Sequence, residues 1–264
     1  MTESALRDPA SGRSARDAGA HSGSAEGSGL PGGVAVSRLR VYDWATSDGL
    51  RGGSPHLHTA STEAYVVLAG RGRVETLSSR GIEVTDLRPG TVAWFTPGTV
   101  HRLINDDGEL DILTIMSNAG LPEAGDAVLT FPMDVLADAS AYARHAMLPI
   151  GRAEADVAAA ARARRDLALE GFASLRERAA SDLGGALDEL YSASAKLVSH
   201  RAGDWKQLVA SGPSAQVHGT ERQLEALAEG LPGTLARSGI TAIVPEPEPR
   251  YGMCGMLTVW DAGR

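Results

Sequence analysis

GSPHLHTASTE (residues 53–63) and GTVAWFTPGTVH (residues 90–101) are the two short clusters that decide the fold of this chain. They contain three histidines and one glutamate of the kinds that hold metal ions in proteins, namely His56, His58, His101 and Glu63. Imidazole and carboxylate groups bind iron, manganese, nickel, copper and zinc. The clusters therefore predict a site for one divalent transition metal ion.

The spacing of these four residues allows them to meet if they lie on short β-strands. His56 and His58 are two residues apart, so on a strand their side chains point to one face. The small polar residues 59–62 are typical of a turn, which lets Glu63 begin a returning strand and face the histidines. The proline–glycine pair at residues 97–98 predicts a second turn, after which a third strand begins. We therefore expect three strands to direct the four side chains to one point.

The order and spacing of the two clusters resemble the two signature motifs of the cupin superfamily. The four donors fall on the metal-ligand positions of that family, and four residues fall on its turn and framing positions: Gly70, Gly90, Gly98 and Asn105. Two positions depart from the family pattern, because Thr96 holds the usual place of the proline and Leu50 that of the leading glycine. Pro97 and Gly49 stand next to these positions and should still turn the chain.

The resemblance extends over residues 34–131 and implies a mainly β fold, the cupin double-stranded β-helix or jelly-roll barrel. Short apolar segments at close and even spacing agree with this expectation, since they are typical of an all-β barrel or jelly roll. Residues 63–69 are apolar on both faces, which indicates cover on both sides and allows a homodimer. The expected strands cover residues 34–42, 63–69, 71–78, 82–87, 92–95, 101–104, 110–117 and 128–131.

The composition changes on either side of this region. Residues 1–33 are rich in Ser, Gly, Ala, Asp and Arg, with Leu6 and Leu30 as their only large aliphatic residues. Such a segment cannot bury enough apolar surface to offset the entropy of ordering, so we expect a disordered tail. Residues 132–264 are expected to form a C-terminal α-helical appendage, because apolar residues there recur at helical spacing.

Three helices and a β-hairpin are expected within this extension. One helix covers residues 154–180, a second follows the capping residue Asp182, and a third covers residues 220–229. Residues 240–244 and 252–260 return to strand character. They predict a C-terminal hairpin that adds to the edge of the barrel.

The composition of the 264-residue chain argues against several classes of partner. Its net charge is −8, which does not favour a nucleic-acid-binding surface. No run of about 18 apolar residues is present, so we expect no membrane partner. Cys254 is the only cysteine, and a single unpaired thiol fits a reducing compartment. We therefore expect a cytoplasmic protein whose partner is a small-molecule substrate.

The resemblance implies a metal-dependent enzyme, because four protein ligands leave one or two positions open on the ion. We expect an oxygenase of the dioxygenase type that acts on a small organic substrate. Iron is the favoured metal, with manganese, nickel, copper and zinc as alternatives. Two other functions stay open: a non-redox isomerase, epimerase or lyase that uses the metal as a Lewis acid, and a non-catalytic cupin that binds a small molecule.

Because alternate residues of a strand point to the same face, the sequence also predicts residues of the site other than the metal ligands. Glu63 is the expected catalytic residue, because a carboxylate that leaves the metal becomes a general base within reach of the substrate. Side chains on the same strand faces, or beside the second cluster, form a mostly apolar and partly aromatic cavity that suits a small organic molecule. The expected substrate-binding residues are Tyr65, Trp94, Leu103 and Asn105.

Overall fold

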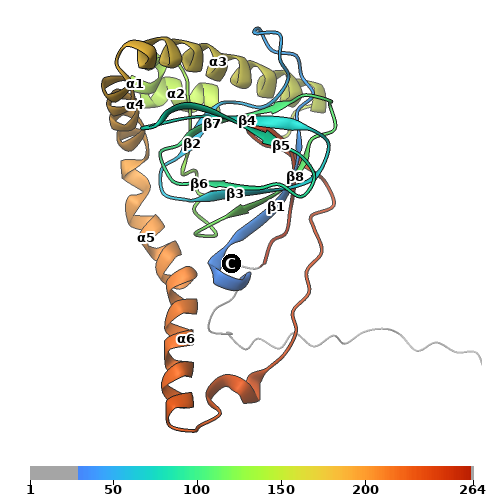
Figure 1. Ribbon diagram of the computed structural model, residues 1–264, viewed down its shortest axis with the longest axis vertical. Coiled ribbons are helices and arrows are strands. Elements are labelled where there is room, and N and C mark those ends of the chain that lie inside the picture. The colour runs from blue at the N-terminus through green and yellow to red at the C-terminus, as the bar shows by residue number, and fades with distance from the viewer. Residues whose placement is uncertain (1–28, 263–264) are drawn as a thin grey trace, which may run out of the picture.

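The computed structural model describes residues 29–262. Two antiparallel β-sheets face each other and form a barrel; helices cover the outer face of one sheet, and a helical arm continues from them past the side of the barrel (Figure 1). The strands are β1 (Ala35–Val41), β2 (His56–His58), β3 (Glu63–Ala69), β4 (Gly72–Ser78), β5 (Gly81–Leu87), β6 (Val92–Phe95), β7 (Val100–Asn105), β8 (Asp111–Met116), β9 (Ala127–Leu129), β10 (Arg250–Tyr251) and β11 (Gly255–Val259). The predicted jelly-roll barrel with a C-terminal helical appendage is confirmed.

Strands that follow one another in the chain are distributed between the two sheets. The larger sheet has the order β10-β11-β1-β8-β3-β6, and the smaller one has the order β5-β4-β7-β2-β9. Each strand predicted before residue 132 overlaps its expected range. The crossing between sheets places β2 and β7 side by side and brings β3 in from the facing sheet, which is what a site built from these three strands requires.

The described chain contains more helices than the sequence indicated. They are η1 (Pro31–Gly33), α1 (Met133–Ala137), α2 (Ala139–Ala146), α3 (Glu154–Ser181), α4 (Leu183–Val198), η2 (Ser199–Arg201), α5 (Ala202–Ser211), α6 (Pro213–Ala228) and η3 (Gly233–Arg237). α3 and α4 match the first two predicted helices, and the Asp182 side chain caps α4 by accepting a hydrogen bond from Gly185 N. The third predicted helix begins at Pro213 rather than Thr220, because proline favours the backbone angle of a first helical residue.

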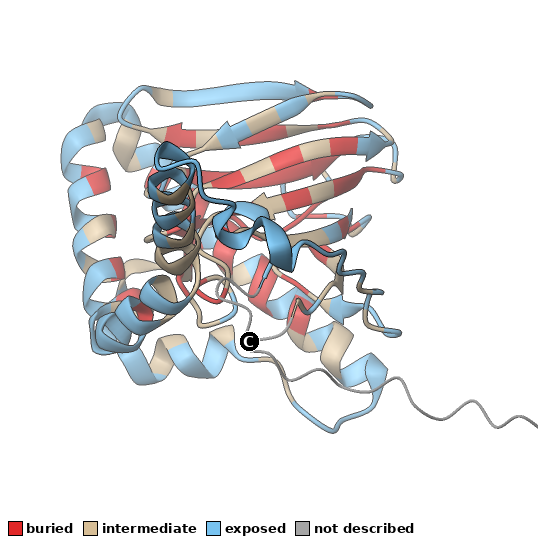
Figure 2. Ribbon diagram, turned by 90° about the horizontal axis from the view of Figure 1, so that it is seen from below, coloured by how far each residue is buried: buried red, intermediate tan, exposed pale blue. Residues whose placement is uncertain are grey.

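Side chains along β2 point alternately to the two faces of its sheet, and an apolar core lies on each face. Leu57 stands between two histidines, so it faces out of the barrel while they face its interior. Outside, Leu57 belongs to an apolar cluster that includes Phe172 of α3 and Leu190 of α4. Inside, a second cluster includes Tyr65 and Leu103. Figure 2 shows buried positions along the central strands and on the helices, whereas the outermost strands are largely exposed.

Polar contacts fix α3 to the barrel in addition to this apolar packing. The Arg165 guanidinium donates to main-chain carbonyl groups of the loop before β2. Arg176 lies 2.8 Å from the carboxylate of Glu75, which is buried on β4. Near the middle of the helix, Thr130 Oγ1 donates to the carbonyl oxygen of Ala168 over 2.9 Å. The helix and the smaller sheet therefore form one packed unit.

The C-terminal strands join the barrel rather than the helices. β11 pairs with β1 at the edge of the larger sheet, and a Cβ at Gly255 would overlap the carbonyl oxygen of Arg40. The predicted hairpin is therefore present, but its first strand is wrong. Residues 240–244 form no strand, since Ile240 and Val244 are 96% and 85% exposed with no strand beside them. The hairpin is built from β10 and β11 instead.

A disordered tail was predicted for residues 1–33, of which residues 1–28 lie outside the described part of the chain. Its last residues form η1, where Gly33 N donates to the Gln216 side chain of α6 over 3.1 Å. Within residues 29–262, no helix is long and apolar enough to cross a lipid bilayer.

Candidate metal centre

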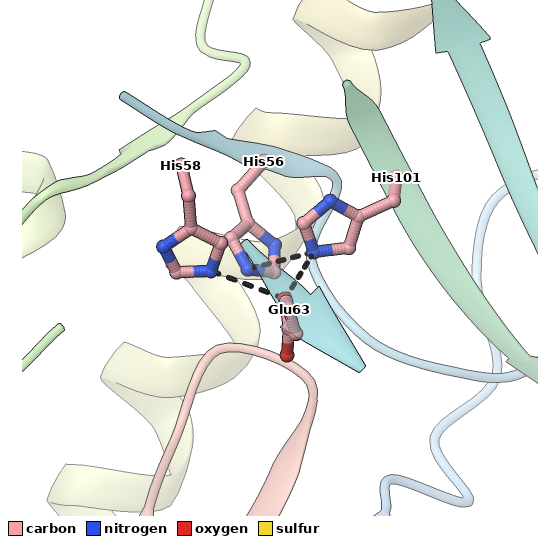
Figure 3. Close-up of side chains that lie close together, drawn as sticks. All are labelled: His56, His58, Glu63 and His101. Carbon is pink, nitrogen blue, oxygen red and sulfur yellow. Dashed lines mark hydrogen bonds and ion pairs between the residues drawn. The ribbon is translucent and has the colours of Figure 1, made fainter. Parts of the chain in front are cut away.

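Four side chains from three strands meet in the barrel interior (Figure 3). His56 and His58 lie on β2, Glu63 begins β3 and His101 lies on β7. One donor atom of each residue lies within 4.8 Å of the other three, and all four residues are buried. The four side chains therefore converge, as their spacing in the sequence predicted.

Strand pairing and one tight turn explain this convergence. His56 pairs directly with His101 in the register of β2 and β7, and directly opposite residues share a face of the sheet. Glu63 reaches the same point from the facing sheet. At the turn before β7, Gly98 has a φ angle of 86°, which glycine adopts without strain, and its N–H donates to the carbonyl of His58 over 2.9 Å.

The hydrogen bonds of the three imidazoles fix which ring nitrogen faces the centre. Each Nδ1 lies within hydrogen-bond distance of an oxygen that can only accept, so each Nδ1 carries a proton. Each Nε2 is then left to face the other donors. The acceptors are the carbonyl oxygen of Ser54 for His56 (2.9 Å), that of Thr99 for His101 (3.1 Å), and the carboxylate of Asp126 for His58 (2.8 Å).

The distances between the inward-facing atoms match those around one metal ion. The Nε2 atoms of His56 and His101 lie 3.1 Å apart, and Glu63 Oε2 lies 3.2 Å from Nε2 of both His58 and His101. This Oε2 is buried and makes no hydrogen bond. Bonds of about 2.1 Å to a common ion place neighbouring donors about 3.0 Å apart in octahedral geometry and about 3.4 Å apart in tetrahedral geometry. The donor set therefore fits a divalent ion such as iron, manganese, nickel, copper or zinc.

Electrostatic coupling keeps the carboxylate of this cluster ionised. Burial opposes ionisation of Glu63, but His101 and His58 outweigh it and hold its pKa below the ordinary range. Burial and the neighbouring imidazoles hold the pKa of His56 well below its usual value. For His58, burial is outweighed by the hydrogen bond to Asp126 and by the Glu63 carboxylate, which raise its pKa to about 9. An ionised carboxylate among imidazoles is the charge arrangement that attracts a cation.

Two residues beside the donors were not predicted from the sequence. The Asp126 carboxylate accepts hydrogen bonds from His58 and from the N–H of Ser61, so it orients both the ring and the loop after β2. The buried thiol of Cys254 lies 3.9 Å from Nδ1 of His56, and burial raises its pKa to about 12. Neither residue stands near the two clusters in the sequence, so spacing gave no signal for them.

The expectation that Trp94 lines the cavity is wrong. In the register of β6 and β3, Phe95 lies opposite Glu63, whereas Trp94 lies opposite Ala64. Trp94 therefore faces outward and is 70% exposed. Phe95 takes the inner position, with its ring centroid 4.2 Å from that of His101.

The other three predicted substrate-binding residues differ in their surroundings. Tyr65 is buried in the interior, with its ring centroid 5.4 Å from that of Phe95. Leu103 is also buried there, in the apolar cluster on the interior side of the barrel. Contact of these two residues with a substrate stays a prediction.

Asn105 has a structural role, contrary to the expectation that it binds substrate. Its amide nitrogen donates to the carbonyl oxygen of Val41 over 3.0 Å. Its amide oxygen accepts from the N–H groups of Gly108 and Leu110, over 3.0 and 3.2 Å. Because these bonds hold the turn after β7 and connect it to β1, the side chain is committed to main-chain groups.

The Asp126→Asn variant is expected to bind metal about 10- to 100-fold more weakly, as is typical when the partner of a ligating histidine is changed. An amide offers one acceptor atom in place of two, so either the His58 ring or the Ser61 N–H loses its partner. Competition with a chromophoric chelator measures the affinity, and Asp86→Asn on the exposed strand β5 is the matched control. Equal affinities in the two variants would show that Asp126 orients no metal ligand.

Comparison with known families supports the architecture. Residues 48–116 match the family model described as Cupin domain. No curated protein matches the chain.

Solved structures that match this chain do so at low identity and over about a third of its length. They include an uncharacterised conserved protein with a double-stranded β-helix domain from Klebsiella pneumoniae (20% identity, covering 32% of this chain and 64% of that one, TM-score 0.24). The coconut allergen cocosin is another (20% identity, 32% and 21% covered, TM-score 0.28). A third is Pac13, a nucleoside dehydratase from Streptomyces (16% identity, 34% and 62% covered, TM-score 0.26). The match thus spans less than two thirds of the length of each of these proteins.

Proposed function

Since residues 48–116 belong to the cupin superfamily and carry a buried cluster of three histidines and one glutamate, we propose that this protein is a metal-dependent enzyme. The reaction we propose is the oxygenation of a small organic substrate, with iron as the resident metal. The observation that carries the proposal is the donor set itself, in which each imidazole turns Nε2 toward the other donors. When bound, such an ion supplies a Lewis acid and, if it is iron, an electron donor toward dioxygen.

The surroundings of the donors favour a neutral organic substrate. Phe95 and Tyr65 stand beside the His101 ring, and the buried cluster on the same interior side consists of apolar and aromatic residues. Apolar walls with a few fixed polar groups are typical of sites for small organic ligands. The His101 side chain is fully buried.

Two side chains are placed to handle protons. Glu63 is ionised, and its carboxylate could accept a proton from a substrate once it has left the ion and the imidazoles that lower its pKa. Burial, reinforced by the charge of Glu63, raises the pKa of Tyr65 well above its ordinary value. Its hydroxyl therefore keeps its proton, which can be donated to the Glu63 carboxylate or to a substrate oxygen that takes its place.

Oxygen uptake tests this proposal. We expect the iron-loaded protein to consume oxygen in step with substrate loss for at least one class in a panel of neutral aromatic and aliphatic compounds. The Glu63→Gln variant should reduce the rate at least about 100-fold, because the general base contributes about 10²–10⁴-fold. Glu109→Gln, at an exposed position, should leave the rate unchanged.

Each alternative function predicts a different result in the same assay. Turnover of a substrate by the zinc-loaded protein without oxygen would replace the proposal with a non-redox isomerase, epimerase or lyase. A compound that binds tightly and is recovered unchanged with every metal would replace it with a non-catalytic binding cupin.

A further inference from the structure

We propose that a second small-molecule site lies outside the barrel, in a cleft between the barrel wall and helices α4 and α5. The cleft has a volume of about 540 Å³, and sites for small ligands usually enclose roughly 300–1,000 Å³. Leu57, Thr59, Ala60 and the turn at residues 97–98 form the wall on the barrel side, and α4, η2 and α5 form the opposite wall. The four metal donors do not line it, so this site is independent of the proposed enzymatic function.

The lining of the cleft selects for a neutral and mainly apolar ligand. Leu57, Pro97 and Val198 provide aliphatic surface on both walls. The hydroxyl of Tyr191, which also lines the cleft, is already engaged in donating to the carbonyl oxygen of Gly98 over 3.0 Å. Among the described residues that line the cleft, none carries a charged side chain. An ion entering it would therefore lose its hydration without gaining a counter-charge.

Two buried polar atoms on the helical wall define the polar part of this ligand. The Ser194 hydroxyl and the Trp205 indole N–H have no hydrogen-bond partner within the described chain, and the two residues are 2% and 8% exposed. Buried polar groups in native proteins are almost always paired. An indole N–H can only donate, so its partner must offer an acceptor. The ligand is therefore a neutral, mostly apolar molecule that carries a carbonyl or similar oxygen.

The two unpaired atoms stand on adjoining helices, which makes the polar part of the site specific. Ser194 lies on α4 and Trp205 on α5, and the two helices are joined through η2. A ligand oxygen would pair with the hydroxyl, which can donate or accept, or with the N–H, which donates. A hydrocarbon of the same shape fills the cleft but leaves both atoms unpaired, so the site should prefer the oxygen-containing molecule.

A pair of matched probes tests this inference. Benzophenone is neutral and apolar with one carbonyl acceptor, and diphenylmethane has the same shape without the acceptor. The protein is titrated with each probe while the indole N–H resonances of its four tryptophans are followed by ¹⁵N–¹H correlation spectroscopy. We expect benzophenone to move the Trp205 resonance saturably and to bind at least about fivefold more tightly than diphenylmethane, as one net hydrogen bond provides.

Three variants separate the proposed contacts from general effects. Trp205→Phe keeps the ring, removes the N–H and assigns the resonance by its disappearance, and Ser194→Ala removes only the hydroxyl. Both variants should reduce the preference for benzophenone over diphenylmethane, and Trp205→Phe should abolish most of it. Ser192→Ala, at an exposed position on the same helix, should change nothing. His101→Ala should leave probe binding unchanged, which distinguishes failure of this site from failure of the metal centre.

Three outcomes would overturn the inference. In the first, neither probe moves the Trp205 resonance. In the second, both probes bind equally and the two polar variants do not alter binding. In the third, the resonance moves with protein concentration rather than with benzophenone, which would assign the cleft to a second copy of the chain. If Trp205→Phe does not fold, Ser194→Ala still decides between these results, because it removes a single buried atom.

Discussion

The His101→Ala variant is expected to lose its bound metal almost completely. His101 is fully buried, and its Nε2 lies 3.1 Å from that of His56 and 3.2 Å from the Glu63 carboxylate, so it contacts two other donors directly. Removing it should weaken binding by more than the 10- to 100-fold loss that follows from changing the partner of a ligand. We expect a loss of about 1,000-fold or more, measured by chelator competition and by metal content after dialysis.

Suitable controls separate loss of a ligand from loss of the fold. His218→Ala removes an exposed histidine on α6 and should retain the metal content of the wild type. His101→Gln keeps most of the side-chain volume and should also lose metal, while circular dichroism shows that the fold is kept. Full metal content in folded His101→Ala protein would refute the proposed centre.

The Gly171→Ala variant is expected to lower the free energy of unfolding by about 3 kcal/mol, at the upper end of the usual cost of overpacking. Gly171 lies within α3, where the barrel comes so close that an added Cβ would overlap the carbonyl oxygen of Thr130 and the main chain of Phe131. In a chain of this size, such a loss lowers Tm by about 6–12 °C. Thermal unfolding followed by circular dichroism measures it.

A glycine-to-alanine substitution at another helical position should raise the stability of the protein instead of lowering it. Gly219 lies within α6, where an added Cβ meets only the end of the Arg222 side chain at 3.9 Å. Alanine is preferred to glycine within helices by about 1 kcal/mol, so Gly219→Ala should raise Tm slightly. A Gly171→Ala variant as stable as Gly219→Ala would mean that α3 does not pack on the barrel as described.

Most of the barrel could be predicted because its signals are local. The two-residue spacing of His56 and His58 and the turn before Glu63 specify which faces of the strands meet. The turn at Pro97-Gly98 likewise reverses the chain where the structure does, with Gly98 in a left-handed conformation. Such short-range rules, together with the resemblance to the two cupin motifs, placed all four donors.

The features that were missed depend on the tertiary path of the chain. Trp94 and Phe95 are adjacent, and only the register of β6 against β3 decides which one faces inward. Asp126 reaches His58 because β9 pairs with β2, which no local pattern indicates. Cys254 comes to lie beside His56 only after the chain has passed through the helical extension and returned to the barrel.

Asn105 shows that a residue at a family motif position can serve the fold. The prediction that Asn105 and His101 share a strand face was correct. However, the Asn105 amide is hydrogen-bonded to main-chain groups of Val41, Gly108 and Leu110. The helical extension was predicted less completely, since α5 is short and α6 begins earlier than its apolar pattern suggested. α6 begins at Pro213 and contacts η1 through Gln216, while none of its residues is buried.

Anomalous diffraction from crystals of the metal-loaded protein tests the central claim most directly. Data collected on both sides of the absorption edge of the added ion would locate it independently of the protein atoms. We predict one strong anomalous peak within bonding distance of Nε2 of His56, His58 and His101 and of the Glu63 carboxylate. An anomalous map with no peak among these four side chains, or with its only peak elsewhere on the molecule, would contradict it.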